Sequence, residues 1–215
     1  METISKYAIP IALVTIFCIL IIGNTGVFAR GSEGIRKGDP LKQEESFSGA
    51  LMAYDTALKI NPKDKQAWVS KGDALNRIGN FSGALMAYDT ALKIDPNYVN
   101  ALDGKGWSLN ELGNYTKAIV YLDEALKIDP TYKWSLSNIG WSLIGLGNYT
   151  KAIVYLDKAL KIDPKHLDGL VFKAQALYKI GNYTGAKYYS DKAFKVDPKS
   201  PALQRLPEAL GRKAQ

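Results

Sequence analysis

Residue types that carry catalysis or bind transition metals are scarce in this chain. Its 215 residues include one histidine and one cysteine, which excludes a disulfide framework and leaves too few ligands for a zinc finger or a haem-attachment motif. His166 lies between Asp163 and Asp168, and no Ser–His–Asp order, nucleophile elbow or phosphate-binding glycine loop accompanies it. We therefore expect no catalytic residue, no metal site and no cofactor.

Binding chemistry is better represented, by tryptophans that stand among asparagine and acidic residues. Trp107, Trp134 and Trp141 occupy positions of this kind. Aromatic faces offer a large contact area at little entropic cost, so these side chains suit recognition of a peptide or a glycan. The alternative is that they pack along neighbouring helices and cover the floor between them.

The elements that would position these residues are set by an internal repeat. Five prolines follow one another at intervals of 34 residues, at positions 62, 96, 130, 164 and 198. Residues 47–62 match 81–96 at every position except 61, where asparagine stands against Asp95. Each unit contains two helical stretches, around 64–78 and 82–94 in the first full repeat. A fixed period of this length predicts a solenoid, and the 47% of hydrophobic residues suffices for its core.

The period divides the chain into segments. We expect a signal peptide or membrane anchor over 1–29 and a polar linker with an eroded half repeat over 30–46. A half repeat with only its second helix follows over 47–62. The complete repeats are 63–96, 97–130, 131–164 and 165–198, and the tail over 199–215 is expected to act as a partial cap.

Small residues recur at fixed places in each repeat. Gly72, Gly106 and Gly140 lie on first helices, with Ala174 in the last repeat, and the small residues expected to meet them from the second helices are Ala84, Ala118, Ala152 and Ala186. With the phased prolines, this pattern resembles the tetratricopeptide repeat family over residues 47–198. The resemblance implies an all-α fold, a right-handed superhelical solenoid of helix-turn-helix repeats. Lys71, Lys105 and Lys173 depart from the family, which has large apolar residues there, so we expect their stems to extend along the surface.

The resemblance also implies that the first helices line a concave groove and that the protein is a non-catalytic scaffold for protein–protein interactions. Positions facing the groove vary between repeats while packing positions stay fixed. The candidate groove residues are Gln66, Asp73, Asn76, Arg77, Asn100, Asp103, Trp107, Asn110, Glu111, Trp134, Asn138, Trp141, Asp168, Phe172, Gln175, Tyr178 and Lys179.

The chemistry of these candidates suggests a ligand class. The basic residues of the family's carboxylate clamp for chaperone C-termini are absent: its positions hold Val69, Asp103, Ser137 and Val171, or Gln66, Asn100, Trp134 and Asp168. The acidic candidates instead favour an extended neutral or basic segment of a protein or peptide partner. The alternatives are a carbohydrate or cell-surface polymer bound by the tryptophans, and the regulatory remnant of a larger enzyme.

The net charge of +7 has a structural explanation. A lysine recurs in the last turn of each second helix, four residues after an aspartate, as in Asp55 with Lys59 and Asp89 with Lys93. We expect these residues to form ion pairs within each helix and to complement the helix dipole. Because the charge is spread along the array without a basic stripe, we expect no nucleic-acid partner.

The N-terminus carries an apolar run from Ala8 to Ile22, which fits a signal peptide and is short for a membrane span. Small residues at Val27 and Ala29 make cleavage after Ala29 plausible. We expect the chain to be exported, and either secreted or anchored at the outer face of the cell membrane by a retained segment.

Four acceptor motifs for N-glycosylation stand in register in the turns between paired helices, at Asn80, Asn114, Asn148 and Asn182. The same residues have a structural explanation. The glycine before each asparagine would close the first helix, and Ser82, Thr116, Thr150 and Thr184 would cap the second.

The helix over 47–60 is expected to lack a covering partner on one side, because Pro40 breaks the stretch before it. Phe47, Leu51 and Tyr54 would then be uncovered. Ends of solenoids expose apolar faces unless they are capped, so we expect weak self-association through this helix.

Overall fold

The computed structural model describes residues 40–210, with side chains from residue 47 onward. Within that range the chain forms nine α-helices and two short 3₁₀ helices, and no strand. The α-helices are α2 (Pro40–Ile60), α3 (Lys65–Arg77), α4 (Phe81–Ile94), α5 (Val99–Glu111), α6 (Tyr115–Ile128), α7 (Lys133–Gly145), α8 (Tyr149–Ile162), α9 (Leu167–Lys179) and α10 (Tyr183–Val196). The 3₁₀ helices η2 (Pro201–Arg205) and η3 (Glu208–Leu210) follow.

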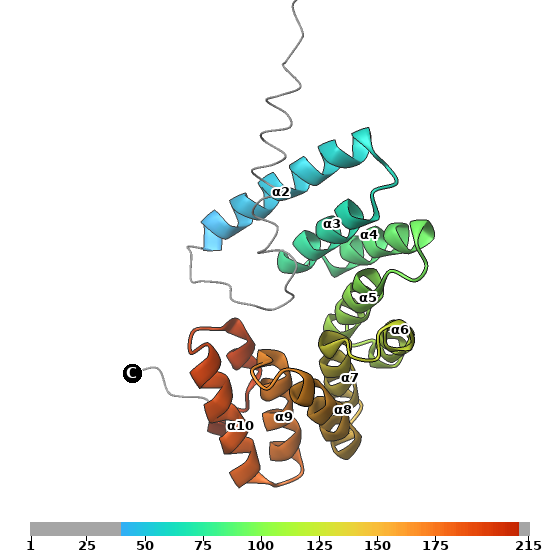
Figure 1. The fold of residues 1–215 in the computed structure, drawn as a ribbon. Helices are drawn as coiled ribbons and strands as arrows, with labels where there is room; N and C mark the ends of the chain where they lie inside the picture. The colour runs from blue at the N-terminus through green and yellow to red at the C-terminus, as the bar shows by residue number, and fades with distance from the viewer. Residues whose placement is uncertain (1–39, 211–215) are drawn as a thin grey trace, which may run out of the picture. The chain divides into compact units, whose positions relative to one another are not determined.

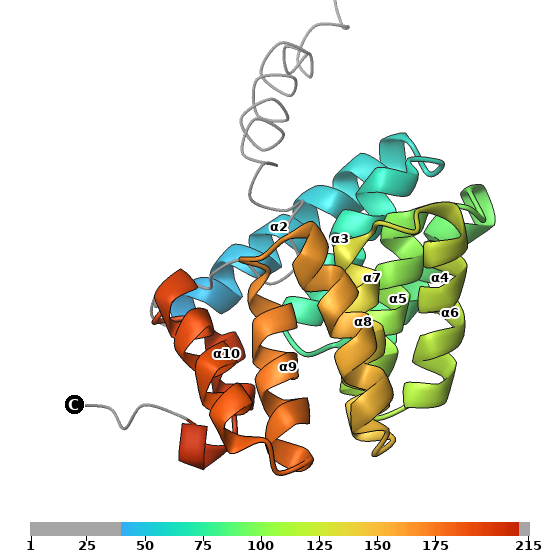
Figure 2. The same cartoon turned by 60° about the horizontal axis from the view of Figure 1, so that its bottom comes forward.

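Each α-helix packs against the next one along the chain, as Figure 1 shows. The first helices of successive repeats, α3, α5, α7 and α9, also contact one another, so they lie at the tighter side of the array. Figure 2 shows α5, α7 and α9 following one another with α6, α8 and α10 beside them. We call the surface formed by α3, α5, α7 and α9 the inner face.

Close approach within three of the four complete repeats depends on glycine on the first helix. A Cβ atom at Gly106 would lie 2.5 Å from the Leu122 side chain, and one at Gly140 would lie 2.6 Å from Leu156. Tyr88 takes the equivalent place over Gly72. The expected partners Ala84, Ala118, Ala152 and Ala186 are fully buried, but the side chain over each glycine belongs to the residue four positions later.

The turn within each repeat has the predicted left-handed glycine and a different N-terminal cap. Gly79, Gly113, Gly147 and Gly181 have φ of 76°, 73°, 77° and 82°, which suits glycine because it lacks Cβ. The cap is the asparagine itself: Asn80 and Asn182 each accept the backbone N–H three residues on, at 2.9 Å. The prediction that Ser82 and the three equivalent threonines cap these helices is therefore wrong.

Ion pairs join neighbouring helices. Lys105 Nζ lies 2.5 Å from Asp89 Oδ1 and 3.8 Å from the centre of the Tyr121 ring, and Lys173 forms the equivalent pair with Asp157. Lys71 pairs with Asp55 at 2.6 Å. At Asp55, Asp89 and Asp157, the predicted pair within the helix is replaced by a pair with a lysine of the next helix.

The two ends of the array differ from expectation. α2 is one continuous helix that begins at Pro40, where a proline is favourable because the first N–H groups of a helix have no partner within it. Pro40 therefore starts this helix. Phe47, Leu51 and Tyr54 are partly buried, whereas Met52 and Ile60 are 71% and 74% exposed.

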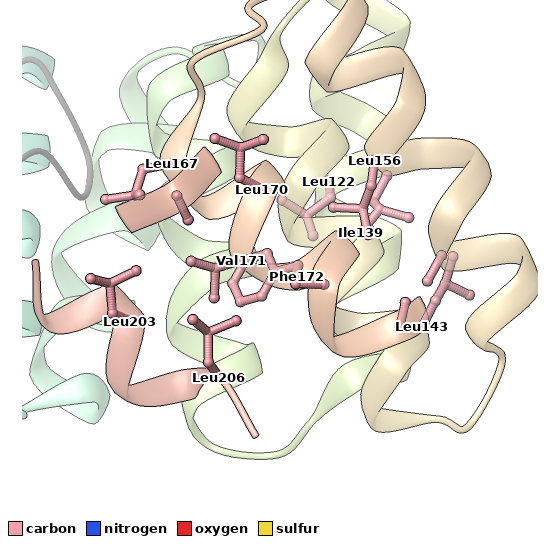
Figure 3. Packing of buried hydrophobic residues seen from close by; sticks show 14 of the residues in the cluster. Leu122, Ile139, Leu143, Leu156, Leu167, Leu170, Val171, Phe172, Leu203 and Leu206 are labelled. Atoms are coloured by element: carbon pink, nitrogen blue, oxygen red, sulfur yellow. The ribbon is translucent and has the colours of Figure 1, made fainter. Parts of the chain in front are cut away.

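The C-terminal segment packs against the last repeat, at the position expected for a partial cap. Leu203 and Leu206 are buried in the same cluster as Leu167, Val171 and Phe172 of α9. Figure 3 shows Leu206 directed toward Val171, and Leu203 on the side of Leu167. η2 therefore lies against a first helix of the array.

Candidate functional site

The inner face holds most of the predicted groove residues, but three of its amides are not available to a ligand. Asn76, Asn110 and Asn138 are 8%, 1% and 5% exposed. Their prediction as contact residues is corrected by this burial. The candidate Phe172 is also buried, at 2% exposed, with the Arg205 guanidinium 5.8 Å from its ring centre. Exposed or partly exposed candidates are Gln66, Asp73, Arg77, Asn100, Asp103, Trp107, Glu111, Trp134, Trp141, Asp168, Gln175, Tyr178 and Lys179.

The buried amides connect successive first helices by hydrogen bonds. Ser108 Oγ donates to Asn76 Oδ1 at 2.8 Å, and Ser142 Oγ donates to Asn110 Oδ1 at 2.6 Å. Asn110 Nδ2 in turn donates to the Asn138 carbonyl oxygen at 3.0 Å. Because both serine–asparagine bonds span 32 residues, they repeat with the period of the array and fix the register of one repeat on the next.

Two carboxyl groups of the inner face are tied into this network. Tyr88 Oη donates to Asp73 Oδ1 at 2.6 Å, and Ser135 Oγ donates to Asp103 Oδ1 at 2.8 Å. Burial raises the pKa of Asp73 to about 7 and that of Asp103 to about 6, although these hydrogen bonds favour the charged forms. Both groups consequently change charge near neutral pH.

An aromatic row crosses the inner face. Phe81 lies 5.9 Å from Trp107, Trp107 lies 6.3 Å from Trp141, and Trp141 stacks on Phe172 at 5.5 Å, each distance joining ring centroids. The row joins side chains of α4, α5, α7 and α9. The rings of Trp107 and Trp141 pack against neighbouring helices, as one sequence interpretation expects, and both stay partly exposed. Their role in recognition stays a prediction.

Trp134 belongs to a different cluster. Its ring lies 5.2 Å from Tyr132 and 6.0 Å from His166, while Lys133 Nζ lies 4.5 Å from its centre. His166 is 5% exposed and its Nε2 is 2.9 Å from Ser137 Oγ. The three tryptophans therefore form two separate groups. His166 is buried between Trp134 and Ser137.

Arg205 of the C-terminal segment reaches the aromatic row. Its guanidinium carbon lies 4.2 Å from the centre of the Trp141 ring and 5.8 Å from that of Phe172. Nη2 forms an ion pair with Glu111 Oε1, and Gln175 Nε2 donates to the Arg205 carbonyl oxygen. The repeat pattern could not find this residue, because Arg205 lies outside the repeats.

The other candidates lie toward the ends or edges of the inner face. Tyr132 Oη donates to Asn100 Oδ1 at 2.8 Å, and Tyr98 Oη donates to Gln66. Tyr178 packs edge-on against Tyr183 at 5.2 Å between ring centroids. Arg77 lies 6.0 Å above the Phe47 ring of α2.

Most lysine charges of the inner face are paired with aspartates from outside the first helices. Of the six lysines in α3, α5, α7 and α9, five pair with aspartates of second helices or of the turns after them: Lys65 with Asp95, Lys71 with Asp55, Lys105 with Asp89, Lys133 with Asp163 and Lys173 with Asp157. The four acidic residues of these helices are Asp73, Asp103, Glu111 and Asp168, of which Glu111 has an ion-pair partner, Arg205. Five of the six lysine charges are thus paired, and the charge of Arg77 acts on Asp73. Asp103 and Asp168 are not matched by these lysines.

Residues 40–210 contain neither a candidate metal-ion cluster nor a helix that could span a membrane. No group of three or more histidine, cysteine, aspartate or glutamate side chains is arranged there to hold a metal ion. No helix in the same range is long and apolar enough to cross a membrane. The apolar segment Ala8–Ile22, on which the export prediction rests, lies outside the described residues.

Paired antiparallel helices with a 34-residue period and consecutive packing define a helical repeat solenoid. Tetratricopeptide repeat models match residues 36–99 and 77–133, and a further one matches residues 143–210. The chain therefore belongs to the tetratricopeptide repeat family. No curated protein matches it in sequence.

Solved structures with this fold include several tetratricopeptide proteins. A thermophilic one from Thermus thermophilus is 22% identical with a TM-score of 0.66, covering 76% of this chain and 90% of that one. MamA from Desulfovibrio magneticus is 20% identical with a TM-score of 0.60, covering 77% and 99%. YrrB, described as having an unusual peptide-binding site, is 20% identical with a TM-score of 0.54, covering 76% and 84%. At these identities the likeness shows the fold alone.

Proposed function

We propose that this protein is a non-catalytic interaction scaffold whose inner face binds an extended neutral or basic segment of a partner protein. The observation that carries the proposal is the distribution of charge. Five of the six lysines on the first helices are paired with aspartates, so the acidic side chains Asp103 and Asp168 of these helices are not matched by them, and an aromatic row crosses the same face. Electrostatic complementarity of this kind selects a partner by charge.

The repeats support a binding role because the positions that recur from repeat to repeat hold the array together, whereas positions on the inner face vary. Serine and asparagine residues that fix the register are buried. Positions equivalent to Trp107 hold Asp73, Trp141 and Gln175 in the other repeats, so this one stripe of the inner face changes chemistry from repeat to repeat. Such variation on a constant scaffold suits sequence-selective recognition. Among the structural neighbours, YrrB is described as having a peptide-binding site.

A carbohydrate ligand is less well supported by the aromatic row. Sugars stack on open ring faces, but Trp141 has Phe172 stacked on it and a guanidinium 4.2 Å from its centre. Trp107 is packed between Phe81 and Trp141. The row therefore offers edges and a cation-binding face, which suit a peptide with basic side chains.

The proposal is tested with three blocked decapeptides that differ only in carrying lysine, glutamine or glutamate at alternate positions. We expect affinity at physiological salt to fall in that order, by about tenfold between lysine and glutamate. Fluorescence anisotropy of labelled peptides measures the dissociation constants. Trp107→Ala is expected to weaken the lysine peptide, and Tyr188→Ala, which removes an aromatic ring 54% exposed on α10, is the matched control. Preference for the glutamate peptide would refute the proposal.

The same proposal places the repeats outside the cytoplasmic membrane, on the strength of the segment up to Ala29. Its test is the N-terminus of the native chain together with protease treatment of intact cells. A chain beginning at Arg30, or one retained in membranes and cut by external protease, is expected; complete protection would exclude export. The acceptors Asn80, Asn114, Asn148 and Asn182 are all exposed, so an exported chain would present them to a glycosylation system. Intact mass measures their occupancy.

A further inference from the structure

The environment of Arg205 is a complete recognition site for a guanidinium group. Trp141 provides a ring face at 4.2 Å, Phe172 extends that face at 5.8 Å, and Glu111 provides the counter-charge. Stacking on aromatic rings and pairing with a carboxylate are the two interactions that distinguish arginine from other residues. The Arg205 side chain stays 32% exposed and Glu111 stays 21% exposed, so the site opens to solvent.

The site occurs at one place in the array. Positions equivalent to Glu111 hold Arg77, Gly145 and Lys179, so no other complete repeat has a carboxylate at this position. The register network does not use these side chains, since it consists of the serines and asparagines beneath them. Glu111 is therefore not required by the repeat architecture, and its contact is with a residue 94 positions away.

The segment that carries Arg205 has the form of a bound peptide. It is one 3₁₀ turn, followed by extended backbone at Leu206 with φ −69° and ψ 143°. Gln175 binds its main chain through the Arg205 carbonyl oxygen, and Leu203 and Leu206 enter apolar positions beside α9 (Figure 3). A main-chain hydrogen bond, two apolar anchors and one charged anchor are features by which extended peptides are recognised.

We propose that Trp141, Phe172 and Glu111 form an arginine-binding subsite of the inner face, which Arg205 occupies in place of an arginine from the partner's extended segment. This inference rests on the proposed function and names its ligand more closely. Because Arg205 is tethered to the site, it acts at a high effective concentration. A partner's arginine must displace Arg205. The apparent affinity for that arginine is therefore the intrinsic affinity multiplied by the fraction of chains in which Arg205 has left the site.

The subsite is tested in the full chain carrying Arg205→Ala, which keeps both leucines and the carbonyl group that Gln175 binds. The probes are N-acetyl-arginine amide and N-acetyl-lysine amide, and the readout is the Trp141 indole N–H signal in NMR spectra. Four tryptophans give few signals, and Trp141→Phe assigns the relevant one. We expect the arginine probe to shift this signal with saturation in the Arg205→Ala chain and about tenfold less in the wild type, while the lysine probe binds about tenfold more weakly.

A second variant separates recognition from a change in folding. Glu111→Gln combined with Arg205→Ala removes the carboxylate and keeps the shape of the side chain, so the arginine probe is expected to lose about tenfold in affinity. Equal binding of the arginine and lysine probes, or equal binding with and without Glu111, would overturn the subsite. If the decapeptides bind the inner face but the arginine probe does not bind the Arg205→Ala chain, the subsite fails and the proposed function stands. If the arginine probe binds and no decapeptide does, the reverse holds.

Discussion

Replacing Leu156 with alanine is expected to lower the free energy of unfolding by about 3–5 kcal/mol. Leu156 is fully buried, and its side chain lies over Gly140, where a Cβ atom would come within 2.6 Å of it. Alanine would leave a cavity between α7 and α8 that the backbone could not close without moving the whole helix pair. Urea denaturation followed by circular dichroism measures the change.

Val154→Ala is the matched control for this substitution. Val154 lies on the same helix, α8, but is 50% exposed, so its loss is expected to cost less than about 1 kcal/mol. Leu122→Ala, one repeat earlier, should reproduce the large effect, because Leu122 covers Gly106 in the same way. Equal effects of Leu156→Ala and Val154→Ala would mean that the helix pairs are not held together at these glycines.

Replacing Asp73 with asparagine is expected to stabilise the protein at pH 8 by about 1–3 kcal/mol. The pKa of Asp73 is raised to about 7 in the fold, and burial is the main cause. Between the unfolded pKa near 3.8 and this value, the folded chain holds more protons than the unfolded one. Wild-type stability should therefore decline as the pH rises from about 4 to about 7, and Asp73→Asn should remove much of that decline.

Asp163→Asn provides a control of opposite sign. Hydrogen bonding to Lys133 lowers the pKa of Asp163, so its charge contributes stability above the unfolded pKa, and that contribution is lost as the pH falls through the lower folded value. This substitution should destabilise at neutral pH and lose its effect in acid. Thermal unfolding from pH 4 to pH 8 compares both variants with the wild type. A loss of stability at pH 8 in Asp73→Asn would contradict this prediction, because it would mean that the fold stabilises the ionised carboxylate.

The fold was predictable because its determinants recur with one period. Prolines 34 residues apart and glycines such as Gly106 and Gly140 specify helix ends and close helix contacts locally. The N-terminal end was harder to predict, because a proline such as Pro40 can either break a helix or begin one. The structure shows that α2 is continuous and begins at Pro40. The ion pairs of Lys105 and Lys173 were missed because the period does not show which neighbouring helix a long side chain reaches.

The sequence predicted which helices form the candidate site, but it did not predict which of their side chains are buried. Asn76 and Asn110 lie on the predicted face, but both are turned into hydrogen bonds with serines 32 residues later. The recurrence of Ser108 and Ser142 at one position of the repeat was a signal for this network. Arg205 had no such signal, since its contact with Glu111 depends on how a non-repeated segment folds back onto the array.

The most direct test of the inner face as the binding surface is site-specific photo-cross-linking of the native chain in its own membranes and medium. A photoreactive phenylalanine derivative is placed at Asn100, exposed at the start of α5, or at Val120, which is 52% exposed on α6. A partner is expected to cross-link from position 100 and not from position 120, through a segment that mass spectrometry identifies as neutral or basic. Cross-linking from position 120 alone, or through an acidic segment, would contradict this prediction.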